Sequence, residues 1–303
     1  MNYRHAYHAG GFADVLKHLV LVALLRHLTN KSKPFCYIET HAGAGSYRLN
    51  AHTLADGTAE FEQGIQRLIQ AIELYQPPLL IREYIDIVKG CGYPDTYPGS
   101  PLIASQILGG LQRLFLSELH PETHQLLTQA LCDDATAQCL QQEGYGLLKA
   151  LLPPRERRAL ILIDPPFESP NEWAYIVQAL EHSLQRFSTG IYLVWFPMKD
   201  LRTVRTWLSK VSALESDKGL LSSGKNFVIE WSPYDQKTTY WGLAACGLLI
   251  INLPWHVQTG LMEDLDYLNR ALGGHPKAQI SLRALCELRR TGCVSPHRRA
   301  GPP

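Results

Sequence analysis

Short, continuous apolar runs alternate with amphipathic stretches along most of the chain. Each run has the length of a single strand and is apolar throughout, which is typical of strands that are covered on both faces of a sheet. Helical stretches lie between several of the runs, so the pattern predicts an α/β fold with a mostly parallel sheet. The predicted strands are residues 35–40, 113–119, 159–163, 191–196, 227–231 and 247–253.

The helical pattern divides the chain into a main domain and an insertion. Residues 13–28 are apolar on most faces, which indicates a largely buried helix, and residues 172–187 form a second clear helix. In a βαβ unit a glycine turn leads into one helix and a second strand, yet Glu118 follows Gly45 by more than 70 residues. We therefore predict a main domain of residues 1–49 and 98–285, a helical insertion subdomain at 50–97 and a disordered tail at 286–303.

Composition narrows the class of protein. The chain has 303 residues, of which 46% are hydrophobic, and a formal net charge of +1. It can therefore bury one large core, and any nucleic-acid surface must be a local patch. No apolar stretch approaches the roughly 18 residues of a membrane span, and no signal peptide is evident, so we expect a cytoplasmic protein with no membrane partner.

The cysteine and histidine patterns do not indicate a metal site. The 7 cysteines include no C-x-x-C pair, which favours reduced thiols. His120 and His124 have the spacing of metal ligands, but no third ligand stands near them, so no metal is predicted. The sequence indicates no obligate protein partner, which is compatible with a monomer.

Polar residues follow the predicted strands where a nucleotide-like ligand would bind. The glycines of "HAGAG" allow close approach of a ligand to the backbone. Ser100 is predicted as the N-cap of a helix whose first residue is Pro101. The start of this helix would offer free N–H groups to an anion, or else Ser100 serves only to cap the helix. Glu118 can accept hydrogen bonds from ribose hydroxyls, or else only cap the next helix. Glu143-Gly144 is placed to meet an adenine.

The stretch "LILIDPPF" ends a buried strand on an acid, two prolines and an aromatic ring. An exocyclic amine on a base is a poor nucleophile, because its lone pair is delocalised into the ring. Asp164, as a carboxylate, can accept one of its N–H groups, and a carbonyl of the rigid Pro165-Pro166 segment can accept the other. Phe167 offers a flat face for stacking, which contributes roughly 1–3 kcal/mol. The order of motifs favours an amino methyltransferase that uses S-adenosylmethionine over a dinucleotide oxidoreductase, since the glycine spacing is not G-x-G-x-x-G.

Five motifs together resemble a known family, the bacterial 23S ribosomal RNA adenine-N6 methyltransferases of the RlmJ type. They are "YRHAYHAGGFADVLKH", "THAGAGSY", "YPGSPLIA", "SELHP" and "LILIDPPF". The resemblance covers about residues 2–255. It implies a class I S-adenosylmethionine-dependent methyltransferase fold (Rossmann-like) with a small helical insertion subdomain, and methyl transfer to N6 of one adenine in 23S rRNA.

The resemblance also implies roles for single residues. It implies that Asp164 is catalytic and that Tyr3 contacts the substrate, in addition to Phe167. The implied cofactor-binding residues are His18, His41, Ser100, Glu118, Glu143, Gly144 and Asp164. Two positions depart from the pattern: the family more often has Asp-Gly where Glu143-Gly144 stands, and Tyr where Phe167 stands.

Two other functions stay open at the level of sequence. The Asp-Pro-Pro-Phe motif at residues 164–167 also serves methylation of adenine in DNA, and only the N-terminal motif favours RNA. A catalytically silent RNA-binding protein on the same scaffold is the other alternative. The N-terminal arm around Tyr3 interleaves aromatic and cationic residues, which suits RNA contact or a lid over the cofactor.

Overall fold

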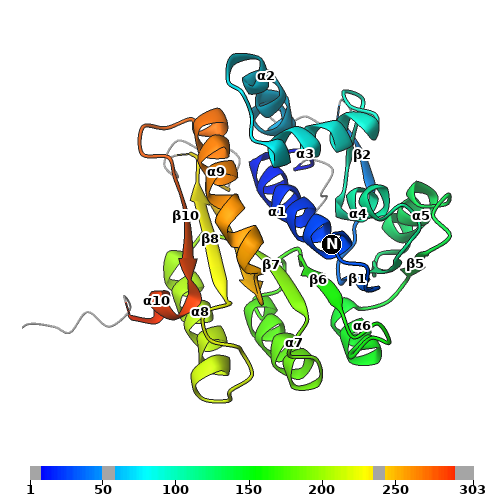
Figure 1. The fold of residues 1–303 in the computed structure, drawn as a ribbon, viewed down its shortest axis with the longest axis vertical. Helices are drawn as coiled ribbons and strands as arrows, with labels where there is room; N and C mark the ends of the chain where they lie inside the picture. The colour runs from blue at the N-terminus through cyan, green and yellow to red at the C-terminus, as the bar shows by residue number, and fades with distance from the viewer. Residues whose placement is uncertain (1–7, 50–58, 235–242, 291–303) are drawn as a thin grey trace, which may run out of the picture.

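The computed structural model describes residues 8–49, 59–234 and 243–290. Its helices lie on both faces of one main sheet (Figure 1). The strands of this sheet are β1 (Cys36–Glu39), β4 (Arg113–Ser117), β5 (Ala137–Leu140), β6 (Ala159–Ile163), β7 (Ile191–Pro197), β8 (Phe227–Ser232), β9 (Cys246–Ile251) and β10 (Gln279–Ala284). The α-helices are α1 (Phe12–Thr29), α2 (Arg67–Leu74), α3 (Leu79–Gly90), α4 (Ser100–Leu108), α5 (Pro121–Ala130), α6 (Gly144–Leu151), α7 (Glu172–Arg186), α8 (Leu201–Ser216), α9 (Trp255–Leu272) and α10 (Leu285–Arg290).

The strand order in the sheet is β10-β8-β9-β7-β6-β1-β4-β5. The five strands from β7 to β5 pair in parallel, while β9 is antiparallel to both of its neighbours and β10 is antiparallel to β8. The predicted α/β class with a mostly parallel sheet is confirmed. All six predicted strands are present, but the direction of the last two could not be predicted from their apolar runs.

The sheet separates two hydrophobic layers. Successive side chains of a strand point to opposite faces, so Leu160 and Leu162 of β6 join one layer and Ile161 and Ile163 join the other. Helices α1, α4 and α9 cover the first face, and α6, α7 and α8 cover the second (Figure 1). Both faces of β6 are therefore buried, as its uninterrupted apolar sequence predicts.

The order of the strands reverses between β1 and β6. From β1 the chain continues through β4 to β5 on one side, and then crosses back to β6 and β7 on the other side. In open α/β sheets, ligands bind outside the carboxyl ends of the strands at such a switch point. The ends of β1 and β6, at Glu39 and Ile163, therefore locate the candidate site.

The region of the predicted insertion is helical and packs on α1. The short strands β2 (Ser46–Arg48) and β3 (Thr96–Pro98) pair antiparallel at its base, and a π-helix, η3 (Glu62–Gln66), precedes α2. Ile81 and Tyr84 of α3 are fully buried in the same layer as α1. This explains why α1 is apolar on nearly all sides. The division into two domains stays a prediction.

The described part of the predicted tail, residues 286–290, is helical, and the rest of the predicted tail lies outside the described residues. Helix α10 contains the first residues of that segment, and Leu288 is buried against the layer that contains α8. Its single apolar turn is too short to show periodicity. None of the helices in the described part of the chain combines the length and apolar character needed to cross a bilayer. Within the same residues no group of three or more His, Cys, Asp or Glu side chains is arranged to hold a metal ion.

Candidate active site

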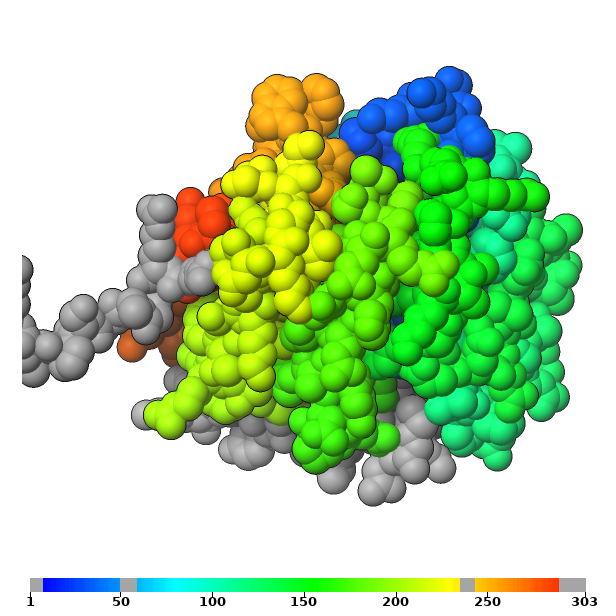
Figure 2. All heavy atoms as spheres, turned by 90° about the horizontal axis from the view of Figure 1, so that it is seen from below, coloured from blue at the N-terminus to red at the C-terminus, as the bar shows by residue number. Residues whose placement is uncertain are grey.

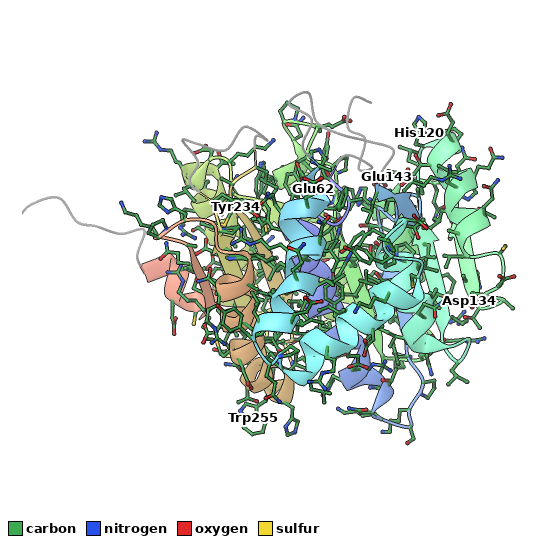
Figure 3. The ribbon with its side chains drawn as sticks, turned by 90° about the horizontal axis from the view of Figure 1, so that it is seen from above. Glu62, His120, Asp134, Glu143, Tyr234 and Trp255 are labelled. Carbon is green, nitrogen blue, oxygen red and sulfur yellow. The ribbon has the colours of Figure 1, made fainter. Side chains whose placement is uncertain are left out.

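The polar residues that follow the parallel strands lie along one edge of the molecule. Glu39 ends β1, Glu118 follows β4, Glu143 follows β5 and Asp164 follows β6. In Figure 3, His120 and Glu143 mark this edge, and Trp255 lies at the opposite end of the molecule. Segments far apart in the sequence thus bring four carboxyl groups to the switch point.

Asp164 is paired with a lysine that the sequence analysis did not identify. The Nζ atom of Lys17 lies 2.6 Å from Oδ2 of Asp164 and 2.9 Å from Oδ1 of Asp14. Burial alone would lower the pKa of Lys17, but the two carboxylates raise the pKa well above its ordinary value, so this lysine stays charged. The Lys17 side chain is only 5% exposed, whereas that of Asp164 is 16% exposed. Asp164 is therefore held in place yet reachable.

The segment after Asp164 presents Phe167 in an unusual backbone conformation. Its φ is +50°, in the left-handed region that aromatic residues rarely adopt. The Phe167 ring packs against Trp173 (centroids 4.7 Å apart) and Trp195 (5.9 Å), which offsets the backbone strain. The ring remains partly exposed, and Phe167 lies only three residues after Asp164 in the sequence.

Glu39 and Ser100 form a buried pair. The Ser100 hydroxyl donates to Oε1 of Glu39 at 2.5 Å, and the Tyr37 hydroxyl donates to Oε2 at 2.8 Å. Burial raises the pKa of Glu39 to about 8, although both hydrogen bonds act to lower it. The prediction of Ser100 as N-cap is wrong: Gly99 is the N-cap of α4, and the Ser100 side chain faces Glu39 instead.

The glycine turn after β1 is bound to Glu118. Gly43 and Gly45 have φ of +65° and +75°, so only glycine fits these positions without strain. Oε2 of Glu118 accepts the Gly43 N–H at 3.0 Å, and Oε1 accepts the His120 N–H at 2.8 Å. Glu118 thus joins the turn to the N-cap of α5. Each carboxylate oxygen has a second lone pair with which it can accept from a ligand.

Glu143 and Gly144 begin α6 directly beside the end of β1. Glu143 is the N-cap and accepts from the N–H groups of Tyr145 and Gly146 at 2.8 and 2.7 Å. A Cβ atom on Gly144 would lie 2.0 Å from the carbonyl oxygen of Thr40. Glycine is therefore required for α6 to approach β1 this closely.

His41 lies between these elements. Burial lowers the pKa of its imidazole to about 4, although the carboxylates of Asp164 and Glu143 act to raise it. The ring is therefore neutral at pH 7. Its Nδ1 atom lies 2.8 Å from Oγ1 of Thr40, and its ring packs edge-on against Tyr145.

His18 is fully buried and faces the insertion. Its Nδ1 atom lies 2.7 Å from the hydroxyl of Tyr97, which lies 2.7 Å from the hydroxyl of Tyr84. Contact with a cofactor stays a prediction for His18, as it does for the other residues of the predicted cofactor site. Tyr3, the predicted substrate contact, lies outside the described residues.

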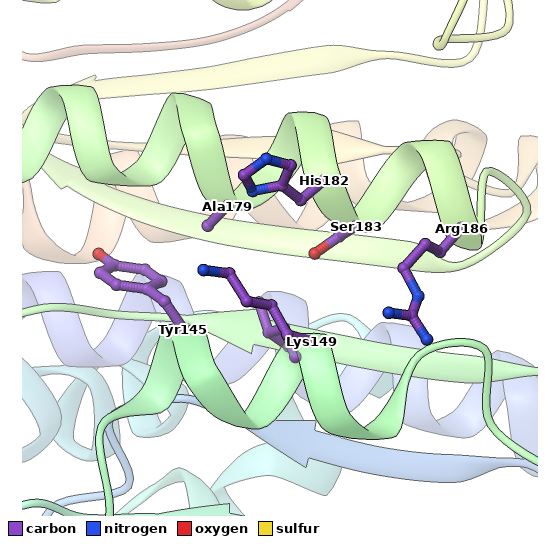
Figure 4. A pocket seen from close by; sticks show the side chains of 7 residues that line it. Tyr145, Lys149, Ala179, His182, Ser183 and Arg186 are labelled. Carbon is purple, nitrogen blue, oxygen red and sulfur yellow. The ribbon is translucent and has the colours of Figure 1, made fainter.

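A small groove between α6 and α7 borders this region (Figure 4). Tyr145 lines it and donates a hydrogen bond to Glu172 at 2.6 Å. The rest of its lining is Leu148, Lys149, Ala179, His182, Ser183 and Arg186. Because the groove runs between two helices and not across the strand ends, it is distinct from the candidate active site.

The sequence analysis missed Lys17 and Glu39. Glu39 ends the first strand as Glu118 ends the second, so the rule applied to Glu118 would have found it. Lys17 lies three residues after Asp14 on a helix, a spacing that signals an ion pair. Its contact with Asp164, 147 residues away, has no local signal.

The switch point, the glycine turn and the strand-ending acids define a class I S-adenosylmethionine-dependent methyltransferase fold. A family model described as "Ribosomal RNA large subunit methyltransferase D, RlmJ" matches residues 32–283. The chain belongs to this family, which confirms the resemblance found in the sequence motifs.

Individual relatives agree with this assignment. "Ribosomal RNA large subunit methyltransferase J" of Haemophilus influenzae is 37% identical, with 90% of this chain and 94% of the relative covered. The Escherichia coli protein of the same name is 36% identical with the same coverage. The crystal structure of protein LPL1258 from Legionella pneumophila is 33% identical and superposes with a TM-score of 0.81 over 91% of this chain and 98% of that chain.

Proposed function

We propose that this protein transfers a methyl group from S-adenosylmethionine to the exocyclic N6 of an adenine in 23S ribosomal RNA. The observation that carries the proposal is the geometry of Asp164: it directly follows β6 at the switch point, is held by Lys17 and is followed by the partly exposed ring of Phe167. The names of the two curated relatives support large-subunit rRNA as the substrate.

The residues at the edge fit the proposed cofactor. The turn carries no side chain at Gly43 or Gly45, so its backbone can approach a ligand closely. The Tyr47 hydroxyl, 2.2 Å from where a Cβ on Gly43 would lie, requires glycine at that position. The carboxylates of Glu118 and Glu143 suit ribose hydroxyls and the adenine amine. Carboxylates also suit a sulfonium cation. When bound, S-adenosylmethionine supplies an electrophilic methyl group.

Asp164 and its neighbours would activate the amine. Lys17 occupies Oδ2 of Asp164, and among the described residues no donor is found on Oδ1. Oδ1 is therefore the oxygen that accepts one N–H of the target amine and directs its lone pair toward the methyl group. The nitrogen becomes acidic once methylated, so its proton leaves without a strong base. Phe167 stacks on the base, which must be unpaired or flipped out to reach this loop.

Asp164→Ala tests the proposal directly. We expect transfer to a 23S rRNA transcript to fall by about 10²-fold or more, as when a preorganised hydrogen-bonding group is removed. Calorimetry should still detect S-adenosylhomocysteine binding, and Asp133→Ala, at an exposed carboxylate, should retain wild-type activity. Full activity of Asp164→Ala would remove this residue from the mechanism.

A second measurement tests the substrate. Modified adenines are mapped in 23S rRNA from cells with and without the protein, and an adenine-containing DNA duplex is offered as competitor in vitro. Loss of one N6-methyladenine from the rRNA supports the proposal. An unchanged rRNA map together with methylation of the DNA would replace it with the DNA alternative.

A further inference from the structure

A patch of cationic and aromatic side chains lies at the amino edge of the sheet, opposite the active site. We call it the amino-edge patch and define it by Trp255, His256, His27, Lys31 and Arg158. Trp255 is 66% exposed, and its ring packs edge-on against His256 at 4.7 Å between centroids. Figure 3 shows Trp255 at the end of the molecule away from His120 and Glu143.

Three segments distant in sequence build the patch. They are the start of α9, the end of α1 with the loop after it, and the residues before β6; their colours, orange, blue and green, meet along one edge in Figure 2. Helices α1 and α9 pack on each other. The Arg158 guanidinium donates to the carbonyls of Lys33 and Leu28, which fixes it against the end of α1. The carbonyl partners are neutral, so the positive charge of Arg158 is not cancelled.

The positive potential of the patch is not balanced by carboxylates. Burial and then the charges of Lys31, Arg158 and His256 lower the pKa of His27. Nearby Arg26, by contrast, is paired with Glu83. Among the described residues, no ion pair with a carboxylate involves Lys31 or Arg158. Clustered cations without carboxylate partners repel one another, so the binding of an anion between them is favourable.

An exposed indole beside such cations matches single-stranded nucleic acid better than an acidic protein surface. Bases stack on aromatic rings irrespective of sequence, while cations contact the flanking phosphates. Along α1 the patch lies about 20 Å from Lys17 at 1.5 Å per residue. An RNA engaged at Asp164 can therefore reach the patch with a neighbouring segment.

We propose that the amino-edge patch binds a single-stranded segment of the RNA substrate outside the target region, with a base stacked on Trp255 and phosphates on Lys31 and Arg158. This inference rests on the proposed function, which supplies the RNA. The patch contributes affinity and has no part in the chemistry at Asp164.

The test uses fluorescein-labelled oligouridine, whose binding is followed by fluorescence anisotropy. Trp255→Ala is expected to weaken binding at least about five-fold. Lys31→Glu is expected to weaken binding and to reduce its dependence on salt, because a phosphate contact is lost. Lys89→Glu, the same charge change on the exposed end of α3, is the matched control and should bind like the wild type.

Steady-state methylation of the 23S rRNA transcript gives a second readout. Trp255→Ala and Lys31→Glu should raise KM and leave kcat unchanged, since Asp164 and Lys17 are intact. Wild-type oligouridine binding by both variants would overturn the proposal. An equal loss in Lys89→Glu would also overturn it. If the wild type binds oligouridine but methylates no rRNA, the proposed function fails while the binding test still stands.

Discussion

Glu39 is a fully buried carboxyl whose ionisation should affect stability. In the folded chain burial raises its pKa to about 8, whereas in the unfolded chain it titrates near 4.3. At a pH below the pKa of the unfolded chain, Glu39 is protonated in both the folded and the unfolded chain, so its ionisation does not reduce stability. As pH rises, only the unfolded chain ionises at first, so stability is lost progressively up to the folded pKa.

Glu39→Gln should therefore change the pH dependence of stability. The amide has nearly the same shape and does not ionise, so the free energy of unfolding of the variant, relative to that of the wild type, should increase from pH 5 to pH 8. The expected change over these three pH units is on the order of 4 kcal/mol, since each unit is worth about 1.4 kcal/mol. Urea unfolding at several pH values measures it. A constant difference between the two proteins would contradict the raised pKa.

At the scale of an element, α6 depends on one glycine for its position. Gly144→Ala would place a Cβ against the Thr40 carbonyl, so the start of α6 must move away from β1. We expect the free energy of unfolding to fall by about 1–3 kcal/mol and binding of S-adenosylhomocysteine to weaken, because Glu143 moves with the helix.

Gly146→Ala is the control: its Cβ meets only Oε2 of Glu143 at 3.4 Å, and helix propensity favours alanine by about 1 kcal/mol. Denaturation and calorimetry compare the two, and equal behaviour would contradict the packing argument.

Elements with one strong apolar face were predictable from sequence, and those shaped by a distant backbone were not. Helix α7 begins and ends within one residue of the prediction. Within the predicted helical insertion, by contrast, the helix is broken at Gly64, whose φ and ψ are −106° and −107°. A Cβ there would lie 2.1 Å from the Gly10 carbonyl. No local pattern encodes that contact. Strand β5 gave a weak signal because it is a partly exposed edge strand.

At the scale of the whole molecule, the sequence predicted six of the eight strands in the described sheet but not how all of them run. Strands β8 and β9 are buried on both faces, so their apolar runs look like those of parallel strands, although β9 is antiparallel to its neighbours. Periodicity reports burial and carries no information on direction. The positions of Asp164 and Glu118 were predictable because strand ends are local features, whereas the Lys17 contact depends on how α1 packs across the sheet.

Packing of the insertion region on α1 predicts that the molecule unfolds as one unit. Ile85 and Val88 of α3 belong to the same hydrophobic layer as Leu21 of α1, and the chain of hydroxyls from Tyr84 through Tyr97 reaches His18. Exposing α3 would therefore also expose α1. We expect the amides of Ile85 and Val88 to exchange hydrogen with the same opening free energy as that of Leu21, measured by native-state exchange in rising urea. A distinctly lower value for α3 would mean that the insertion opens by itself and that its contacts with α1 contribute little to the stability of the main domain.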